Sequence, residues 1–201
     1  MIKKILIYSF LIITSILTLI PFMWMIGASF MFDGKASVFP PIFLPDPFTL
    51  TQYQILFERL NVWRNFFNSL LLSSMVTILY ITFTSMAGYA FAKYRFAGKK
   101  VLFNLLLSSM IIPSQVTMLP LFLLLKSMGF INTYMAIIIP GLANIFGIFL
   151  IRQYCLSIPD SLIEAARMDG ATDFQVYRKV ILPLAVPILV TLAIFSFLGT
   201  W

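Results

Sequence analysis

Four carboxylates lie close together in this sequence and have the side chains to bind a metal or to transfer protons: Asp160, Glu164, Asp169 and Asp173. Their spacing, however, is that of residues that begin and end helices, and the 201-residue sequence has no histidine to complete a metal or acid–base site. Cys155 is the single cysteine, which excludes an intrachain disulfide and a CxxC motif. We therefore expect no catalytic residue and no metal site in this chain.

The composition is that of a membrane protein. Hydrophobic residues make up 61% of the sequence and charged residues only 10%, whereas a soluble domain is about half apolar and a quarter charged. The net charge of +7 does not predict nucleic-acid binding, because the basic residues are scattered and form no stripe. Gly98-Lys99-Lys100 lacks the preceding loop and the hydroxyl of a GxxxxGK[ST] nucleotide site, so we expect no cofactor bound by this chain.

Five apolar segments are long enough to cross a bilayer, which takes about 20 helical residues. We expect each to form one spanning helix, since the strands of a barrel would alternate over shorter stretches. Prolines inside the segments are tolerated in a bundle, where neighbouring helices and Ser or Thr side chains satisfy the freed carbonyl groups. The segments are residues 5–26, 66–92, 101–125, 134–151 and 182–201.

The first segment has two interpretations. Lys3 and Lys4 before an apolar run, and small residues from Gly27 after it, fit a cleaved signal peptide. The run is longer than an ordinary signal-peptide core, and Trp24 stands where a membrane interface would anchor it. We therefore favour an uncleaved anchor.

The basic residues predict the orientation. Four of them, Lys35, Arg59, Arg64 and Lys126, fall in the loops on one side of the predicted bundle. By the positive-inside rule, the side with more basic residues is cytoplasmic, and it contains the N-terminus and the loop after the fourth segment. The ten basic residues of that side are Lys3, Lys4, Lys93, Arg95, Lys99, Lys100, Arg152, Arg167, Arg178 and Lys179.

The loop over residues 29–65 is rich in prolines and aromatic residues. The prolines favour an extended, stiff course, and Thr49 is placed to cap a short helix that runs through Leu60. The loop suits a docking surface for an outside partner, and it equally suits a connector packed on the bundle.

One polar stretch, EAARMDGATDFQVYRKVILPL from Glu164, interrupts the apolar chain. Residues 161–164 fit a capping box that begins a helix, with residues 157–160 as an alternative start, and residues 172–175 fit a second box. Gly170 predicts a break between them, because glycine readily takes the left-handed conformation that ends helices. The sequence thus predicts a short helix, a glycine turn, a second helix and a membrane span.

Helical spacing places residues 160, 164 and 167 on one polar face of the first helix, and Leu162, Ala165 and Ala166 on another face. The two alanines leave a shallow surface without bulky side chains. Such a surface suits the cleft of another protein, and it equally suits tight packing against helices of the same chain. The residue pattern leaves both interpretations open.

The stretch IPDSLIEAARMDGATDFQVYRKVILPLAVP closely resembles the EAA loop of ABC-importer permeases, in which EAA is followed by three residues, a glycine and a hydrophobic-x-Leu-Pro exit. Glu164, Ala165, Ala166, Gly170 and Pro183 meet that pattern here. Three further stretches resemble the maltose-type sugar-importer branch, so the likeness covers essentially the whole chain: PFMWMIGASFM, NSLLLS and AGYAFAKYRFAGKK.

This resemblance implies an all-α polytopic membrane protein with the transmembrane fold of ABC type I importers. Residues 1–65 would form the first transmembrane helix and an extracytoplasmic loop, and residues 66–201 the permease core, with a coupling-helix hairpin at 157–183. Members of the family continue beyond the position of Trp201 with one more span, so the chain has five of about six expected helices and looks truncated at its C-terminus.

The resemblance also implies partners. The coupling hairpin would contact a cytoplasmic ABC ATPase dimer, which binds ATP and Mg. A second permease subunit and an extracytoplasmic solute-binding protein would complete the importer in the bilayer of a bacterial inner membrane. The residues implied at the ATPase contact are Glu164, Ala165, Ala166, Asp169 and Gly170.

The apolar segments contain polar residues but no interior charge, which disfavours a proton- or ion-coupled secondary transporter, as does the lack of a second copy of the hairpin. Amides and hydroxyls beside aromatic residues suit a sugar, although each is also typical of hydrogen bonding between helices. A non-sugar solute such as glycerol phosphate or a polyamine is the alternative. The candidate substrate-path residues are Asn104, Ser108, Gln115 and Asn144.

Overall fold

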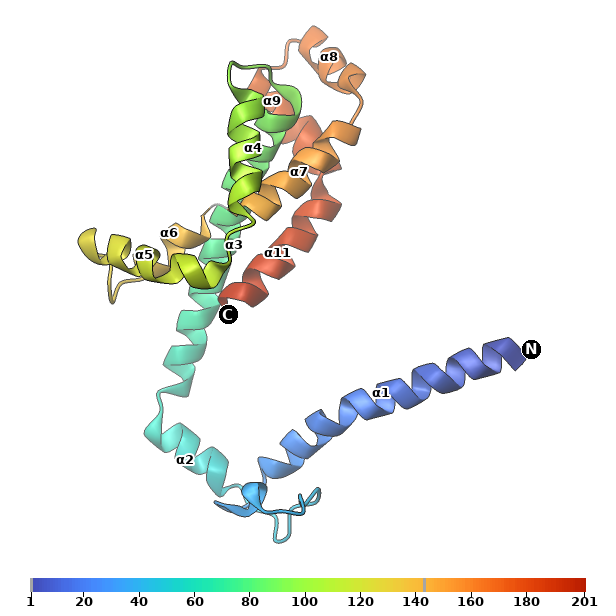
Figure 1. Cartoon of the computed structure of the whole chain (residues 1–201), viewed down its shortest axis with the longest axis vertical. Coiled ribbons are helices and arrows are strands. Elements are labelled where there is room, and N and C mark those ends of the chain that lie inside the picture. Colours follow the sequence, from blue (N-terminus) through green and yellow to red (C-terminus); the bar gives the residue numbers. More distant parts are fainter. Residues whose placement is uncertain (1, 143) are drawn as a thin grey trace. The chain divides into compact units, whose positions relative to one another are not determined.

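The computed structural model describes residues 2–142 and 144–201, and these residues form helices, turns and loops without any strand. Its contacts divide the chain into two compact units, Met1–Phe66 and Phe67–Trp201. The long helix α3 (Val62–Lys93) begins in the first unit and continues into the second. The prediction of an all-α protein is confirmed (Figure 1).

The first unit contains α1 (Ile2–Ala28), the short 3-10 helix η1 (Lys35–Ser37) and α2 (Thr51–Arg59). The hydroxyl oxygen of Thr49 accepts a hydrogen bond from the backbone N–H of Thr51 at 3.1 Å. Thr49 therefore supports the start of α2 as predicted, but from one residue before the cap, which is Leu50.

The proline-rich loop between α1 and α2 folds on itself. The ring of Phe30 stacks on that of Phe48, with 4.7 Å between the centroids, and the Tyr53 hydroxyl donates a hydrogen bond to Ser29 Oγ at 2.9 Å. Aromatic stacking of this kind adds to the energy of burial. The loop is thus a folded connector, and its use as a docking surface stays a prediction.

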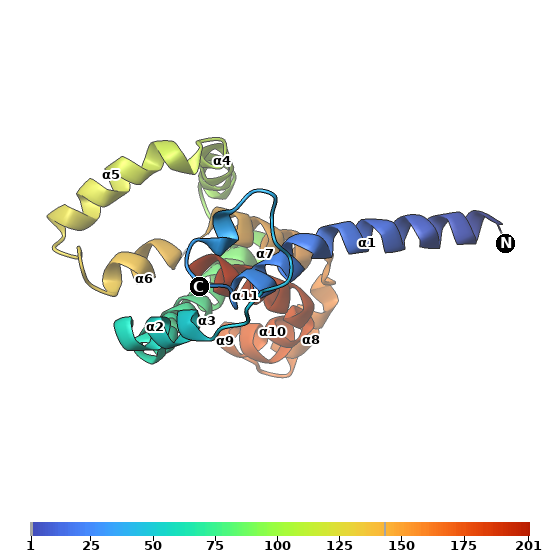
Figure 2. The ribbon, with the colours of Figure 1, turned by 90° about the horizontal axis from the view of Figure 1, so that it is seen from below.

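The second unit is a helical bundle in which α5 and α6 extend to one side, as Figures 1 and 2 both show. The loop that joins α3 to α4 lies at the same end of this unit as α8 and α9 (Figure 1). Its elements after α3 are α4 (Lys99–Ser109), α5 (Ser114–Ser127), α6 (Met135–Gly141), α7 (Ile145–Ser157), α8 (Asp160–Met168), α9 (Asp173–Val176), the π-helical turn η2 (Tyr177–Ile181), α10 (Leu182–Leu184) and α11 (Val186–Thr200).

Three helical runs are long and apolar enough to cross a membrane by themselves: Lys3–Ala28, Val62–Lys93 and Met135–Ser157, the last of which includes residue 143, outside the described residues. The number rises to five if two bent helix pairs each count as one span. The third and fifth predicted spans are these bent pairs, with bends of 104° between α4 and α5 and of 79° before α11. The prediction of one continuous helix per apolar segment is wrong at both places.

Prolines account for both bends. After α4, the backbone N–H groups of residues 110–112 donate to carbonyls three residues earlier, a tight turn that ends at Pro113. The residue before a proline is disfavoured in the α conformation, so the helix stops there and α5 starts afresh. Before α11, Pro187 has no N–H to donate to the carbonyl of Pro183, and the chain bends at Ala185.

Close contact between α3 and α7 depends on two glycines. A Cβ atom at Gly88 would lie 2.7 Å from side-chain atoms of Ile151, and a Cβ atom at Gly147 would collide with the hydroxyl oxygen of Tyr80. Small residues at such positions let membrane helices approach closely. The main hydrophobic core of the unit forms along this contact and extends to α8, α9 and α11.

Candidate functional site

The polar stretch forms a helical hairpin, residues 160–176, which we call the polar hairpin: α8, a turn at Gly170, and α9. Gly170 has a φ of +83°, and its N–H donates to the carbonyl of Arg167 at 3.0 Å. The N–H of Ala171 donates to the carbonyl of Ala166 at 3.0 Å. These two bonds form a Schellman motif, which satisfies the last carbonyls of a helix and turns the chain. The predicted glycine turn is confirmed.

The two predicted capping boxes have different outcomes. The second is confirmed, because the Thr172 hydroxyl accepts from the N–H of Gln175 while the Gln175 side chain accepts from the N–H of Thr172. The first is wrong in both versions. Helix α8 begins at Asp160 behind Pro159, whose ring favours a helix start, so Ser161 already lies in the first turn, and the Ser157 hydroxyl donates to the carbonyl of Tyr154.

The inner side of the polar hairpin packs against the spanning helices. Ile163 of α8 and Val176 of α9 are buried in one hydrophobic cluster with Tyr89 of α3 and Ile151 of α7. Tyr177, just after α9, shares a buried hydrogen bond of 2.6 Å with Ser85 of α3. Burial of this kind fixes both helices of the hairpin to the ends of the spans.

The outer side of the polar hairpin carries exposed apolar residues. Met168 is 88% exposed, and Leu162 and Phe174 are also exposed. Ala165 is exposed among them, whereas Ala166 is half-buried against the core. The two interpretations of the alanine pair therefore each hold for one residue: Ala166 packs within the chain, and Ala165 stays available to a partner.

An ion pair joins α3 to the start of α8. Lys93 Nζ lies 2.6 Å from Asp160 Oδ1 and also donates to the carbonyl of Ile158 at 2.6 Å. The hydrogen bond and the charge of Lys93 hold the pKa of the Asp160 carboxyl below its usual range. The sequence counted Lys93 only as a basic loop residue and gave no signal that it pairs with a residue 67 positions later.

The predicted polar face is confirmed, since Asp160, Glu164 and Arg167 line one cavity of about 390 Å³. Arg167 also reaches across the turn to Asp173 at 2.9 Å, and this pairing raises its pKa. Asp160 and Asp173 are thus each paired with a cation. In the described part of the chain, no group of three or more His, Cys, Asp or Glu residues is placed to hold a metal ion.

The four candidate substrate-path residues do not meet in one cavity. Asn104 lines a cavity between α4 and α7, while Asn144 lines another with residues of α3 and α11. Asn144 also accepts a hydrogen bond from the N–H of Phe146 and so caps α7. Ser108 donates to the carbonyl of Asn104 within α4, and Gln115 is exposed at the start of α5.

The other residues predicted for the ATPase contact are all in the polar hairpin. Glu164 and Asp169 are exposed, and Asp169 ends α8 with its N–H bonded to the carbonyl of Ala165 at 3.0 Å. Gly170 is exposed at the tip of the turn. Glu164, Ala165, Asp169 and Gly170 are thus brought together on accessible surface.

Comparison with known proteins supports this likeness. Residues 81–201 match the family described as binding-protein-dependent transport system inner membrane component. The arabinooligosaccharides transport system permease protein AraQ of Halalkalibacterium halodurans is 38% identical over 161 residues, which cover 80% of this chain and 58% of that protein. The diacetylchitobiose uptake system permease protein NgcG of Streptomyces coelicolor is 30% identical over 196 residues, which cover 96% of this chain and 65% of that protein.

A solved structure is also similar. The crystal structure of a bacterial ABC transporter involved in the import of the acidic polysaccharide alginate matches with a TM-score of 0.86 and 28% identity, over 100% of this chain and 71% of that chain. The present chain thus spans between about half and two thirds of the length of the curated relatives it matches. The predicted resemblance to ABC-importer permeases is confirmed, and the chain belongs to the family of binding-protein-dependent transport system inner membrane components.

Proposed function

We propose that this chain is the membrane permease subunit of an ATP-driven importer and forms part of the path for a sugar or oligosaccharide. A separate ATPase dimer would bind ATP and Mg and dock on the polar hairpin. A second permease subunit and an extracytoplasmic binding protein that delivers the sugar would complete the assembly in a bacterial inner membrane. The N-terminus and the polar hairpin would then be cytoplasmic, in keeping with the positive-inside rule.

One observation carries this proposal: the polar hairpin is buried on one side and exposed on the other. Ile163 and Val176 pack among residues of the spans, while Leu162, Ala165 and Met168 are exposed on the same hairpin. An ATPase can bias the spanning helices only through a contact that differs between two states of the transporter. A rigid hairpin with one free face and one face in the core meets that requirement.

Saccharide as the solute class rests on the relatives. The printed names of AraQ, NgcG and the solved transporter refer to arabinooligosaccharides, diacetylchitobiose and alginate, all of which are saccharides. Thermal-shift measurements on the cognate binding protein, with a panel of carbohydrates, would identify the sugar. A binding protein stabilised only by glycerol phosphate or a polyamine would contradict the proposed solute class.

Cysteine crosslinking tests the docking surface. Ala165→Cys and Met168→Cys in the full-length protein, co-assembled with its ATPase, should each crosslink to that ATPase, because both side chains are exposed on the polar hairpin. Ala97→Cys is the matched control, since Ala97 is also exposed but lies in the loop between α3 and α4. The native Cys155 is buried and should not react. Crosslinks from neither hairpin position, or equally from Ala97, would contradict the assignment.

A further inference from the structure

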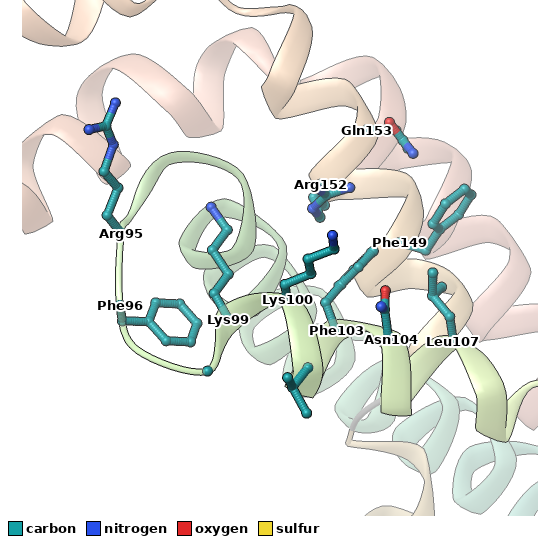
Figure 3. Close-up of a pocket in the computed structure, with 12 residues that line it drawn as sticks. Arg95, Phe96, Lys99, Lys100, Phe103, Asn104, Leu107, Phe149, Arg152 and Gln153 are labelled. Carbon is teal, nitrogen blue, oxygen red and sulfur yellow. The ribbon is translucent and has the colours of Figure 1, made fainter.

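A cavity of about 840 Å³ lies between α4 and α7, at the end of the second unit where α3 is joined to α4 (Figure 3). Four of the twelve residues that line it are basic, namely Arg95, Lys99, Lys100 and Arg152, and none is acidic. We call it the basic cavity. An uncompensated group of cations is unfavourable by itself and becomes favourable when an anion enters.

Lys100 and Arg152 are the cations most available to a ligand. Among the described residues Lys100 has no hydrogen bond or ion pair, and its side chain points toward Arg152 in Figure 3. Arg152 is held in place, with its guanidinium carbon 4.2 Å above the centre of the Phe103 ring and its Nε donating to the carbonyl of Phe91 at 3.2 Å. In the described part of the chain its terminal nitrogens make no hydrogen bond, so they remain free to donate.

The other two cations are partly engaged. Lys99 Nζ donates to the carbonyl of Tyr94 at 2.8 Å. Arg95 also lines the neighbouring cavity that contains Asp160, and its charge acts on that carboxyl. These two residues add to the positive potential of the basic cavity, but Lys100 and Arg152 are placed to contact an anion directly.

The remaining wall of the basic cavity is largely apolar. Phe103, Leu107 and Phe149 line it beside the cations, and Val101, at its rim, is 65% exposed. Helix α4 belongs to a bent pair apolar enough to form a span, so its exposed apolar side chains face acyl chains in a bilayer. A ligand that fits both parts has an anionic head and an apolar tail.

We propose that the basic cavity binds the phosphate group of an anionic phospholipid, such as phosphatidylglycerol, with Lys100 and Arg152 as the phosphate ligands and an acyl chain along Phe149 and Val101. Basic pockets between membrane helices take lipid head groups of this kind, because phosphate oxygens accept several charge-assisted hydrogen bonds. The site depends neither on the identity of the transported solute nor on the contact with an ATPase.

Native mass spectrometry of the full-length protein, purified in detergent with the subunits that remain bound, tests this site. Phosphatidylglycerol and phosphatidylcholine are titrated separately into wild type, Lys100→Gln and Lys126→Gln. Lys126 is the matched control, because it is an exposed lysine of α5 that does not line the basic cavity. Lys100→Gln should weaken phosphatidylglycerol binding about fivefold, as expected for the loss of one cation near a membrane surface, while phosphatidylcholine binding and the control should not change.

A third titration, with inorganic phosphate, separates the two sources of a phosphate group. Lysine-dependent binding of inorganic phosphate at concentrations comparable to the lipid would overturn the lipid assignment in favour of a soluble ligand. Equal effects of Lys100→Gln and Lys126→Gln, or no effect of either, would also overturn it; the latter is the expected result if another protein subunit covers the cavity. Because the readout is lipid binding, failure of the proposed transport function would leave this result unaffected.

Discussion

The turn of the polar hairpin depends on Gly170 for a purely conformational reason. Its φ is +83°, and no atom lies within 4 Å of the position that a Cβ atom would take, so a larger residue meets no obstacle among the described residues. A residue with a Cβ atom in the left-handed conformation loses about 1–2 kcal/mol. Such a loss changes an equilibrium about 5- to 30-fold, so Gly170→Ala should populate altered turns, and the β-branched Gly170→Val should do so more strongly.

Gly129 provides a matched control. It lies between α5 and α6, with a φ of +75° and no atom within 4 Å of a Cβ atom, so Gly129→Val carries the same conformational cost away from the polar hairpin. The assay is sugar uptake per ATP hydrolysed by the full transporter in proteoliposomes. We expect Gly170→Val to lower this ratio by about 5-fold or more without loss of membrane insertion, and Gly129→Val to leave it near the wild-type value.

Two results would refute this reasoning. If Gly170→Val inserts normally and keeps the wild-type ratio of uptake to ATP hydrolysis, the turn does not transmit the conformational change. If Gly129→Val lowers the ratio as much as Gly170→Val does, the loss reflects a general loss of stability rather than a role of the hairpin. Gly170→Ala should fall between wild type and Gly170→Val, since its side chain is smaller and unbranched.

Two further predictions concern the packing and the ion pair that position the hairpin. Gly147→Ala should lower the Tm of the purified protein, because its Cβ would collide with the Tyr80 hydroxyl and overpacking costs about 1–3 kcal/mol; Gly199→Ala, in open space, should not, and equal Tm values in thermal unfolding would contradict this. Lys93 lowers the folded-state pKa of Asp160, so their pair stabilises the fold above the unfolded carboxyl pKa of about 3.9 and is lost as the pH falls through the lower folded value. The Tm difference between wild type and Asp160→Asn should therefore be present at neutral pH and shrink below about pH 4, and a constant difference would be the contrary result.

The sequence predicts best those features that depend on a few adjacent residues. The turn at Gly170 and the capping box from Thr172 to Gln175 follow from local backbone geometry, and both are present. The bends at Pro113 and Ala185 were not predicted, because a proline in an apolar segment is compatible with a continuous helix or with a break. Packing against neighbouring helices decides between these outcomes, and a single sequence does not contain that information.

The site was predicted only as far as the periodicity of one helix reaches. Spacing placed Ala165 and Ala166 on one face, but the direction of the core relative to that face decides which alanine is buried, and Ala166 is the one that packs inward. The pairing of Asp160 with Lys93 joins residues far apart in the chain, so helix spacing could not reveal it. The sequence signal that did hold was the polar face itself.

Helix α8 has to be considered as a part of the membrane core as well as a surface. Ile163 shares a buried cluster with Tyr89 of α3, Ile151 of α7 and Leu192 of α11, so a displacement of α8 requires these residues to repack. Packed cores change between discrete arrangements rather than deforming continuously. A partner that contacted only the exposed face and left Ile163 in place would therefore not move the spans. Coupling requires that binding on the outside of α8 favours a second packing of the residues on its inside.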